Sequence, residues 1–278
     1  MSIDDGRPRL EVATRAAREG GRLALQHLGD PLYFKLKGHR DVMVGAAQVV
    51  QDAIRDMLLA DFPGDAFMGE EGPDDEELPI AAERLWVVDP IDGSINYLQG
   101  LPLFGISIAY REAGVFRVGV VYDPARDEVF SATFSGGAWL NGEPIAVDRQ
   151  GEGEDIYDAS VIGCDYPGDG SLRTRTLLGA GQLAGRFMAM LSLGSPALSL
   201  CYIAAGRLHG YFHLRLHVWD IAAAGLILRE AGGVLTNLSG GSWLHSEGAY
   251  VASNGAVHGE MLRLLKVCLP SPSGRGPG

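Results

Sequence analysis

The 278-residue chain has little cysteine, no surplus of positive charge and no long apolar run. Its three cysteines, at positions 164, 201 and 268, are too few and too widely spaced for a disulfide framework or a cysteine-based zinc site. The 35 acidic and 23 basic residues give a formal net charge of −12, which argues against a general nucleic-acid-binding surface. No apolar run reaches the roughly 20 residues of a membrane-spanning helix, and the first residues lack the features of a signal peptide. We therefore expect a cytoplasmic enzyme with neither a nucleic-acid nor a membrane partner.

Two closely spaced aspartates follow a short apolar run. Residues 86–88 (Trp-Val-Val) predict the end of a buried strand, and Pro90 and Gly93 predict a turn directly after it. Asp89 and Asp92 then lie close together, and two such carboxylates repel unless one takes up a proton or a cation lies between them. Mg²⁺ suits this arrangement because it prefers oxygen ligands. From this segment alone, a capped turn with a solvated aspartate remains an equal alternative.

Two other acidic sites favour the metal interpretation. Glu70 and Glu71 stand between glycines after an apolar pair, and Asp220 stands between an apolar strand end and a helix of small residues. Asp220 alone fits a helix N-cap better than a ligand, since aspartate is a favoured capping residue. The combination of these acids with Asp89 and Asp92 is more specific than any one of them.

These residues occur in segments that resemble the inositol monophosphatase family of Mg²⁺-dependent, lithium-sensitive phosphatases, over nearly the whole chain. The matching segments are Gly69-Glu70-Glu71, the run Asp89-Pro-Ile-Asp-Gly-Ser-Ile-Asn-Tyr97, the hairpin 136–142 and Trp219-Asp-Ile-Ala-Ala-Ala-Gly225. The resemblance implies an α/β fold, a layered α-β-α-β-α sandwich whose N-terminal half is α+β, and a homodimer.

The pattern of elements agrees with two halves. Helices are predicted at 9–28 and 46–60, strands at 106–110, 118–122 and 129–133, and a hairpin at Asn141-Gly142. The polar segment 148–155 is the best boundary. We therefore expect residues 1–150 to form a helix and antiparallel-sheet half with most metal ligands, and residues 151–278 an α/β half with Asp220. The acidic run 74–77 predicts a solvated loop, and the tail 270–278 predicts no fixed structure.

The resemblance also implies the metal ligands. Glu70, Asp89 and the carbonyl oxygen of Ile91 would hold a first Mg²⁺, and Asp89, Asp92 and Asp220 a second. Glu70 would also serve a third, weaker ion through water. Such ions neutralise phosphate oxygens, activate a water molecule and stabilise the leaving oxygen.

The phosphate-binding residues implied by the resemblance are Gly93 and Ser94. Both would present backbone N–H groups, and Ser94 would add its hydroxyl group. Ser94 and Glu70 would be the catalytic residues. No protein nucleophile is required, because in-line phosphoryl transfer depends mainly on positioning and charge.

The substrate side is implied to include Asp92, Gly194 and Ser195. Ser195 followed by Pro196 predicts a helix start with a capping serine, and capping alone would explain both residues. By resemblance, this turn lies beside the substrate.

A fourth substrate-side residue is His213, on a strand predicted by the alternation over 209–218. Inositol-specific family members carry an acid at this position. A histidine with Arg215 nearby suits a substrate that has a second negative group, and His213→Glu would then shift preference towards neutral polyol phosphates. A solvated strand residue is the equal alternative.

The chain departs from the family pattern where the attacking water is activated. After Asp41, the family has a threonine and then an acid, but this chain has Val44 and Ala47. Ser94 also replaces a threonine. General-base help contributes about 10²–10⁴ in rate, so Glu70 must compensate or turnover is slow.

The resulting hypothesis is a Mg²⁺-dependent phosphomonoesterase that hydrolyses a small cyclitol, sugar or related phosphate. The alternatives are a sugar bisphosphatase, a nucleotide 3′-phosphatase, a histidinol-phosphate phosphatase, or a catalytically impaired binding or regulatory homologue, because Ala47 replaces the usual acid.

Overall fold

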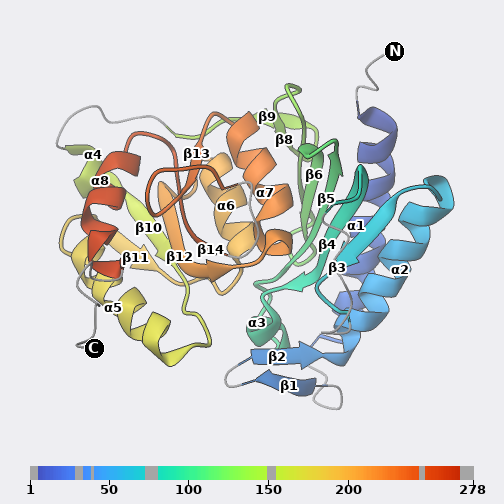
Figure 1. The fold of residues 1–278 in the computed structure, drawn as a ribbon, viewed down its shortest axis with the longest axis horizontal. Coiled ribbons are helices and arrows are strands. Elements are labelled where there is room, and N and C mark those ends of the chain that lie inside the picture. The colour runs from blue at the N-terminus through green and yellow to red at the C-terminus, as the bar shows by residue number, and fades with distance from the viewer. Residues whose placement is uncertain are drawn as a thin grey trace, which may run out of the picture.

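Two β-sheets separate three layers of helices (Figure 1). The structure, a computed structural model, describes residues 6–28, 34–38, 41–72, 81–148, 155–243 and 248–269. The order of layers across the molecule is helix, sheet, helix, sheet, helix. The expected α/β sandwich of five layers is therefore confirmed.

The larger sheet has seven strands in chain order, antiparallel except for its first pair, which is parallel. The Asn141-Gly142 hairpin joins its last two strands, as predicted. The strands are β3 (Ala66–Gly69), β4 (Arg84–Asp92), β5 (Gly105–Glu112), β6 (Val115–Asp123), β7 (Glu128–Thr133), β8 (Ala138–Leu140) and β9 (Glu143–Ile145).

The smaller sheet has five strands and mixed pairing. In spatial order they are β11 (Ala189–Leu191), β10 (Val161–Cys164), β12 (Gly210–Leu216), β14 (Gly248–Ser253) and β13 (Val234–Asn237). Strand β10 is parallel to both of its neighbours, and the remaining pairs are antiparallel. A separate hairpin consists of β1 (Phe34–Gly38) and β2 (Asp41–Val44).

Helices cover both faces of each sheet. Helices α1 (Arg7–Gln26) and α2 (Gly45–Asp61) pack on the outer face of the larger sheet and match the two predicted N-terminal helices. Helices α6 (Pro196–Ala204) and α7 (Val218–Glu230) lie between the sheets. Helices α5 (Gly170–Ala184) and α8 (His258–Leu264) cover the far face of the smaller sheet. The short elements are α3 (Ser94–Leu98), α4 (Asp155–Ala159) and a 3₁₀ turn at Leu265–Cys268.

The apolar run before Asp89 is continuous because β4 is buried on both faces. Leu85 and Val87 contribute to the central core with α6 and α7, whereas Trp86 and Val88 face α1 and α2. Neighbouring strand residues point to opposite faces, so a strand covered on both sides needs apolar residues at every position.

The prediction that this strand ends at Val88 is wrong. Strand β4 continues through Pro90 to Asp92, and its pairing with β5 shifts register between Asp89 and Asp92. A bulge tolerates proline because the residue without an N–H group falls where the hydrogen-bonding ladder is interrupted.

The two expected halves share one core. The central cluster combines Val121 and Phe130 of the larger sheet with Leu198 of α6 and Ile221 of α7. Residues 149–154, at the expected boundary, lie outside the described residues, as do the acidic run 74–77 and the tail 270–278. The division at residue 150 stays a prediction.

Within the described ranges, no helix is both long enough and apolar enough to cross a membrane.

Gly119 of β6 allows α7 to approach the larger sheet. A Cβ atom at this position would lie 2.7 Å from the carbonyl oxygen of Ala223, which is backbone and cannot rotate away. We expect Gly119→Ala to destabilise the protein by about 1–3 kcal/mol, measured by urea unfolding.

The matched control is Gly181→Ala in α5, where the added methyl group would meet nothing within 4 Å. Because alanine has the higher helix propensity, this change should be neutral or stabilising by up to about 1 kcal/mol. Equal effects of the two substitutions would contradict the close approach of α7.

Candidate active site

Three carboxylates meet where β4 ends beside the start of α7. Ligand oxygens of Asp89, Asp92 and Asp220 all lie within 4.8 Å of one another. Asp89 and Asp92 are 2 % and 3 % exposed, so two of the three carboxylates are withdrawn from water. With Glu70, described next, they form what we call the acidic cluster.

Glu70 joins the other acids through the parallel pairing of β3 with β4. Gly69 lies opposite Val88, and the Glu70 N–H group donates to the Val88 carbonyl oxygen at 3.1 Å. Glu70 therefore adjoins Asp89, and its carboxylate is near enough to raise the pKa of Asp89.

The bulge of β4 positions Asp89. The N–H group of Ile91 donates to Asp89 Oδ1 at 3.0 Å, which fixes the carboxylate against its own turn. Ile91 is 2 % exposed and lies between the two aspartates. The role of its carbonyl oxygen as a metal ligand stays a prediction.

Asp92 is held by the start of α6. Its Oδ2 accepts hydrogen bonds from the Ser195 hydroxyl and, at 2.8 Å, from the Ala197 N–H group. Ser195 also caps α6 by accepting from the Leu198 N–H group at 3.3 Å, and Pro196 is the first helical residue. The predicted helix start is confirmed, and its capping serine also contacts the acidic cluster.

Asp220 is not the N-cap of α7. The helix begins at Val218, His217 occupies the N-cap position, and Asp220 is the third helical residue. The carboxylate of Asp220 accepts from the His217 N–H group at 2.7 Å. The carboxylate of an acid at the third helical position can accept from a free backbone N–H group at the start of the helix. In this position the Asp220 carboxylate also stays near the other carboxylates.

Burial and mutual repulsion raise the proton affinity of this site. Burial raises the pKa of Asp89 well above its usual range, and the charge of Glu70, followed by those of Asp92 and Asp220, adds to the effect. Burial also raises the pKa of Asp92 to about 7, against the hydrogen bonds from Ser195 and Ala197. A divalent cation would relieve this repulsion, and a donor set made only of oxygens fits Mg²⁺.

Gly93 and Gly194, predicted to contact phosphate and substrate, are neighbours in the structure. Gly93 precedes α3 with φ of +105°, and a Cβ atom there would lie 2.9 Å from the Leu103 carbonyl and 3.0 Å from that of Gly194. Ser94 is the first residue of α3. Asn96 ties the two segments together by donating to the carbonyls of Leu103 at 2.8 Å and Leu193 at 2.7 Å.

Asp165 is a further carboxylate beside Gly194 that the sequence did not predict. It is buried and accepts hydrogen bonds from the Ser192 hydroxyl at 2.7 Å, the Gly194 N–H group at 2.9 Å and the Tyr211 hydroxyl at 3.0 Å. Its only sequence signal is a lone acid after an apolar strand. The parallel register of β10 and β12, which places it beside His213, appears only in the fold.

The interpretation of His213 as a solvated residue is wrong, because its side chain is 7 % exposed. Its Nδ1 accepts from the Arg215 N–H group at 3.2 Å, which assigns the ring proton to Nε2. Burial lowers the pKa of His213 to about 4, with the charge of Asp165 opposing the shift. At neutral pH the ring is uncharged, so Nε2 is available as a hydrogen-bond donor but the ring supplies no positive charge to a second anionic group.

Ala47 lies on α2 and is 3 % exposed. Its methyl group offers no proton acceptor, so the departure seen in the sequence persists in the fold.

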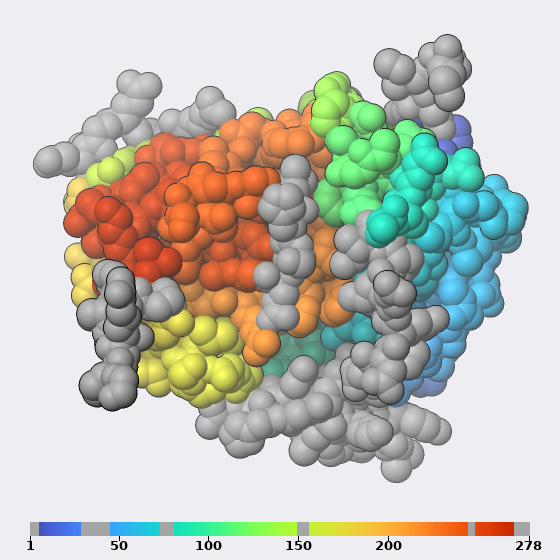
Figure 2. Space-filling model, in the orientation of Figure 1, coloured from blue at the N-terminus to red at the C-terminus, as the bar shows by residue number. Residues whose placement is uncertain are grey.

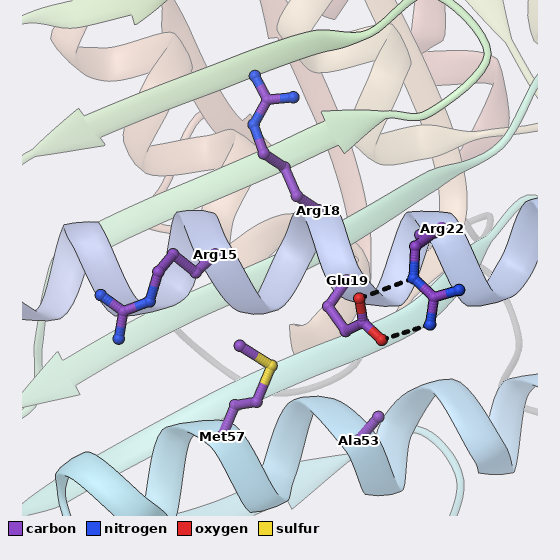
Figure 3. A pocket seen from close by; sticks show the side chains of 6 residues that line it. All are labelled: Arg15, Arg18, Glu19, Arg22, Ala53 and Met57. Atoms are coloured by element: carbon purple, nitrogen blue, oxygen red, sulfur yellow. Dashed lines mark hydrogen bonds and ion pairs between the residues drawn. The ribbon is translucent and has the colours of Figure 1, made fainter.

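A groove of 660 Å³ between α1 and α2 is a separate feature (Figure 3). Arg15, Arg18 and Arg22 line it, but Arg15 pairs with Asp61 at 2.9 Å and Arg18 with Asp127 at 2.5 Å. Arg22 bonds both carboxylate oxygens of Glu19. Acids of the chain therefore already compensate the charges of all three arginines.

A family model described as the inositol monophosphatase family matches residues 5–268. An inositol-1-monophosphatase from Mesorhizobium japonicum is 35% identical over 92% of this chain and 96% of its own length. The Nus factor SuhB of Escherichia coli is 34% identical over 93% of this chain and 96% of its own.

A fructose-1,6-bisphosphatase/inositol-1-monophosphatase from Thermotoga maritima is 32% identical over 96% of this chain and 99% of its own. A solved IMPase structure from the same organism covers 94% of this chain and 98% of its own with a TM-score of 0.84 and 33% identity.

The buried neutral His213 should make stability fall at acidic pH. Its pKa is about 4 in the folded protein and 6.5 in the unfolded chain, so between these values the unfolded state binds more protons. The contribution of the neutral His213 ring to the free energy of unfolding is complete above pH 6.5 and is lost as the pH falls towards 4. Between pH 7 and pH 4.5, the destabilisation caused by His213→Gln should therefore shrink by roughly 2–3 kcal/mol.

Urea unfolding of the wild type and His213→Gln at both pH values measures this difference. The exposed His27→Gln is the control for loss of a histidine. A destabilisation by His213→Gln that is the same at both pH values would contradict the burial of a neutral ring.

Proposed function

The chain belongs to the inositol monophosphatase family, and on this basis we propose that it is a Mg²⁺-dependent phosphomonoesterase acting on a small cyclitol, sugar or related phosphate. The observation that carries the proposal is the acidic cluster. Two buried carboxylates and a third within 4.8 Å repel one another, which is unfavourable in a folded protein without a cation.

Family membership, together with this cluster, supports a proposed set of metal ligands. Glu70, Asp89 and the carbonyl oxygen of Ile91 would bind one Mg²⁺, and Asp89, Asp92 and Asp220 another, with Glu70 available to a third. When bound, the ions would neutralise phosphate oxygens and make a water molecule more acidic.

Gly93 and Ser94 would bind the phosphate group. The N-terminus of α3 presents backbone N–H groups, and Ser94 adds a hydroxyl donor. Asn96 ties the segment of Gly93 to that of Gly194 by donating to the carbonyls of Leu103 and Leu193, so the two segments that would orient the phosphate and the rest of the substrate are held together.

Glu70 is the group proposed to accept the proton of the attacking water. It adjoins Asp89, and Ala47 supplies no competing base. Because one general base contributes about 10²–10⁴ in rate, we expect turnover below that of family members with an acid at this position.

The substrate side favours a neutral polyol that carries a single phosphate. Asp92 and Asp165 are carboxylates, and His213 is uncharged at neutral pH and donates through Nε2. Hydroxyl groups suit this lining, whereas a second phosphate would be repelled. This proposal replaces the expectation that His213 favours a substrate with two negative groups.

A sugar bisphosphatase remains the second candidate, since the Thermotoga maritima relative is named for both activities. A purely regulatory role is less favoured, because the complete acidic cluster would destabilise a protein that binds no cation there. One relative is named a Nus factor, so the absence of a nucleic-acid partner stays a prediction.

We also propose a homodimer located in the cytoplasm. The exposed apolar side chains of Leu177, Leu178 and Met188 support self-association, and the three cysteines are all buried free thiols.

Phosphate release with Mg²⁺ tests the proposal. The panel comprises inositol monophosphates, sugar mono- and bisphosphates, histidinol phosphate and nucleotide 3′-phosphates. We expect release from a polyol monophosphate, and a loss on the order of 10²–10³-fold in Asp89→Asn, because the site loses a charge that positions the metal.

The control is Asp56→Asn, an exposed aspartate on α2 that pairs only with Arg55 in the contacts described and should leave activity unchanged. Release from no substrate above the Asp89→Asn background would reject phosphatase activity. A preference for bisphosphates would reject the neutral polyol.

A further inference from the structure

Gln51 is a buried residue whose side-chain amide is hydrogen-bonded to the loop that carries Glu70. Its side chain is on α2, one helical turn after Ala47, and the residue is 3 % exposed. Gln51 Oε1 accepts from the Glu71 N–H group at 2.9 Å, and Gln51 Nε2 donates to the Glu71 carbonyl oxygen. Both polar groups of the Glu71 backbone are thus bonded by one side chain from another element.

The chain on either side of Glu70 is therefore held by different layers. On one side, the Glu70 N–H group bonds to Val88 of β4. On the other side, the amide of Gln51 on α2 fixes the Glu71 backbone. Gly69 leaves room for this contact, because a Cβ atom there would collide with the Gln51 amide.

Glu70 itself lies between these two backbone contacts. Glu70 reaches the acidic cluster from a loop rather than from a strand or a helix, so the strand pairing alone does not fix its orientation beyond residue 69. Its contact is with Asp89, the most buried carboxylate of the cluster. Removing a group that does not bind the metal but orients one of its ligands typically changes metal affinity about 10–100-fold.

We propose that Gln51 is a positioning residue that orients Glu70 by clamping the Glu71 backbone and so sets the affinity of the acidic cluster for Mg²⁺. The inference rests on the proposed function for the identity of the cation. It does not rest on turnover, since its evidence is the contact between α2 and the loop.

The test is a Mg²⁺ titration of the melting temperature of the full chain. A ligand that binds only the folded state raises the melting temperature, and the concentration dependence gives the affinity. In Gln51→Leu, which has similar size but no amide, the Mg²⁺ concentration for the same shift should rise about tenfold.

The matched control is Gln48→Leu on the same helix. Gln48 is exposed and bonds only to Asp52 of its own helix among the contacts described, at 3.2 Å. Its substitution should leave the Mg²⁺ dependence unchanged. Should Gln51→Leu fail to fold, Gln51→Asn shortens the side chain by one methylene, withdraws the amide from Glu71 and should weaken Mg²⁺ binding in the same direction.

A lower melting temperature with unchanged Mg²⁺ dependence in the folded Gln51 variants would overturn the inference, because the amide would then serve stability alone. No response of the wild type to Mg²⁺ would also overturn it. A wild type that responds to Mg²⁺ but releases no phosphate would reject the proposed activity, while the comparison of Gln51 with Gln48 would still decide the inference.

Discussion

Repulsion among buried carboxylates is the constraint on which the rest of this structure depends. Asp89, Asp92 and Asp220 come within 4.8 Å of one another, and burial raises the pKa values of the first two. Each of the three accepts a backbone hydrogen bond from a different segment, namely the β4 bulge, the start of α6 and the start of α7. These donors favour the charged forms but do not cancel the repulsion, which leaves the site suited to a cation.

The layered fold holds this unfavourable arrangement in place. In the space-filling view, the orange surface of the C-terminal half lies directly against the green surface of the N-terminal half (Figure 2). Helices α6 and α7 lie between two sheets, and Gly119 brings α7 against β6, so the segments that donate to Asp92 and Asp220 are packed on both sides. On a surface loop, the same repulsion would move the carboxylates apart. Close packing of the central core prevents this movement, because rearrangement would open cavities.

The catalytic and substrate sides of the site differ in how far they follow the family. The acidic cluster contains every metal-ligating acid that the resemblance implies, whereas Ala47 removes a base. Asp165, directly after β10, and His213 of β12 are both buried, and the charge of Asp165 acts on the His213 ring. Membership of the family therefore supports the class of reaction more strongly than the substrate. The neutral ring and the two carboxylates on this side are properties of this chain, and under the proposed function they would decide which phosphate ester fits.

The sequence by itself determined the features that depend on neighbouring residues. Asp89 and Asp92 lie close together because only two residues separate them, Ser195 and Pro196 begin a helix, and the Asn141-Gly142 hairpin follows from turn chemistry. Only the tertiary structure decided the rest, because strand register and burial come from contacts between distant segments. Parallel strand pairing brings Glu70 to Asp89 and Asp165 to His213. The amide of Gln51 on α2 bonds to Glu71, which follows a strand of the neighbouring sheet. Burial keeps the His213 ring neutral.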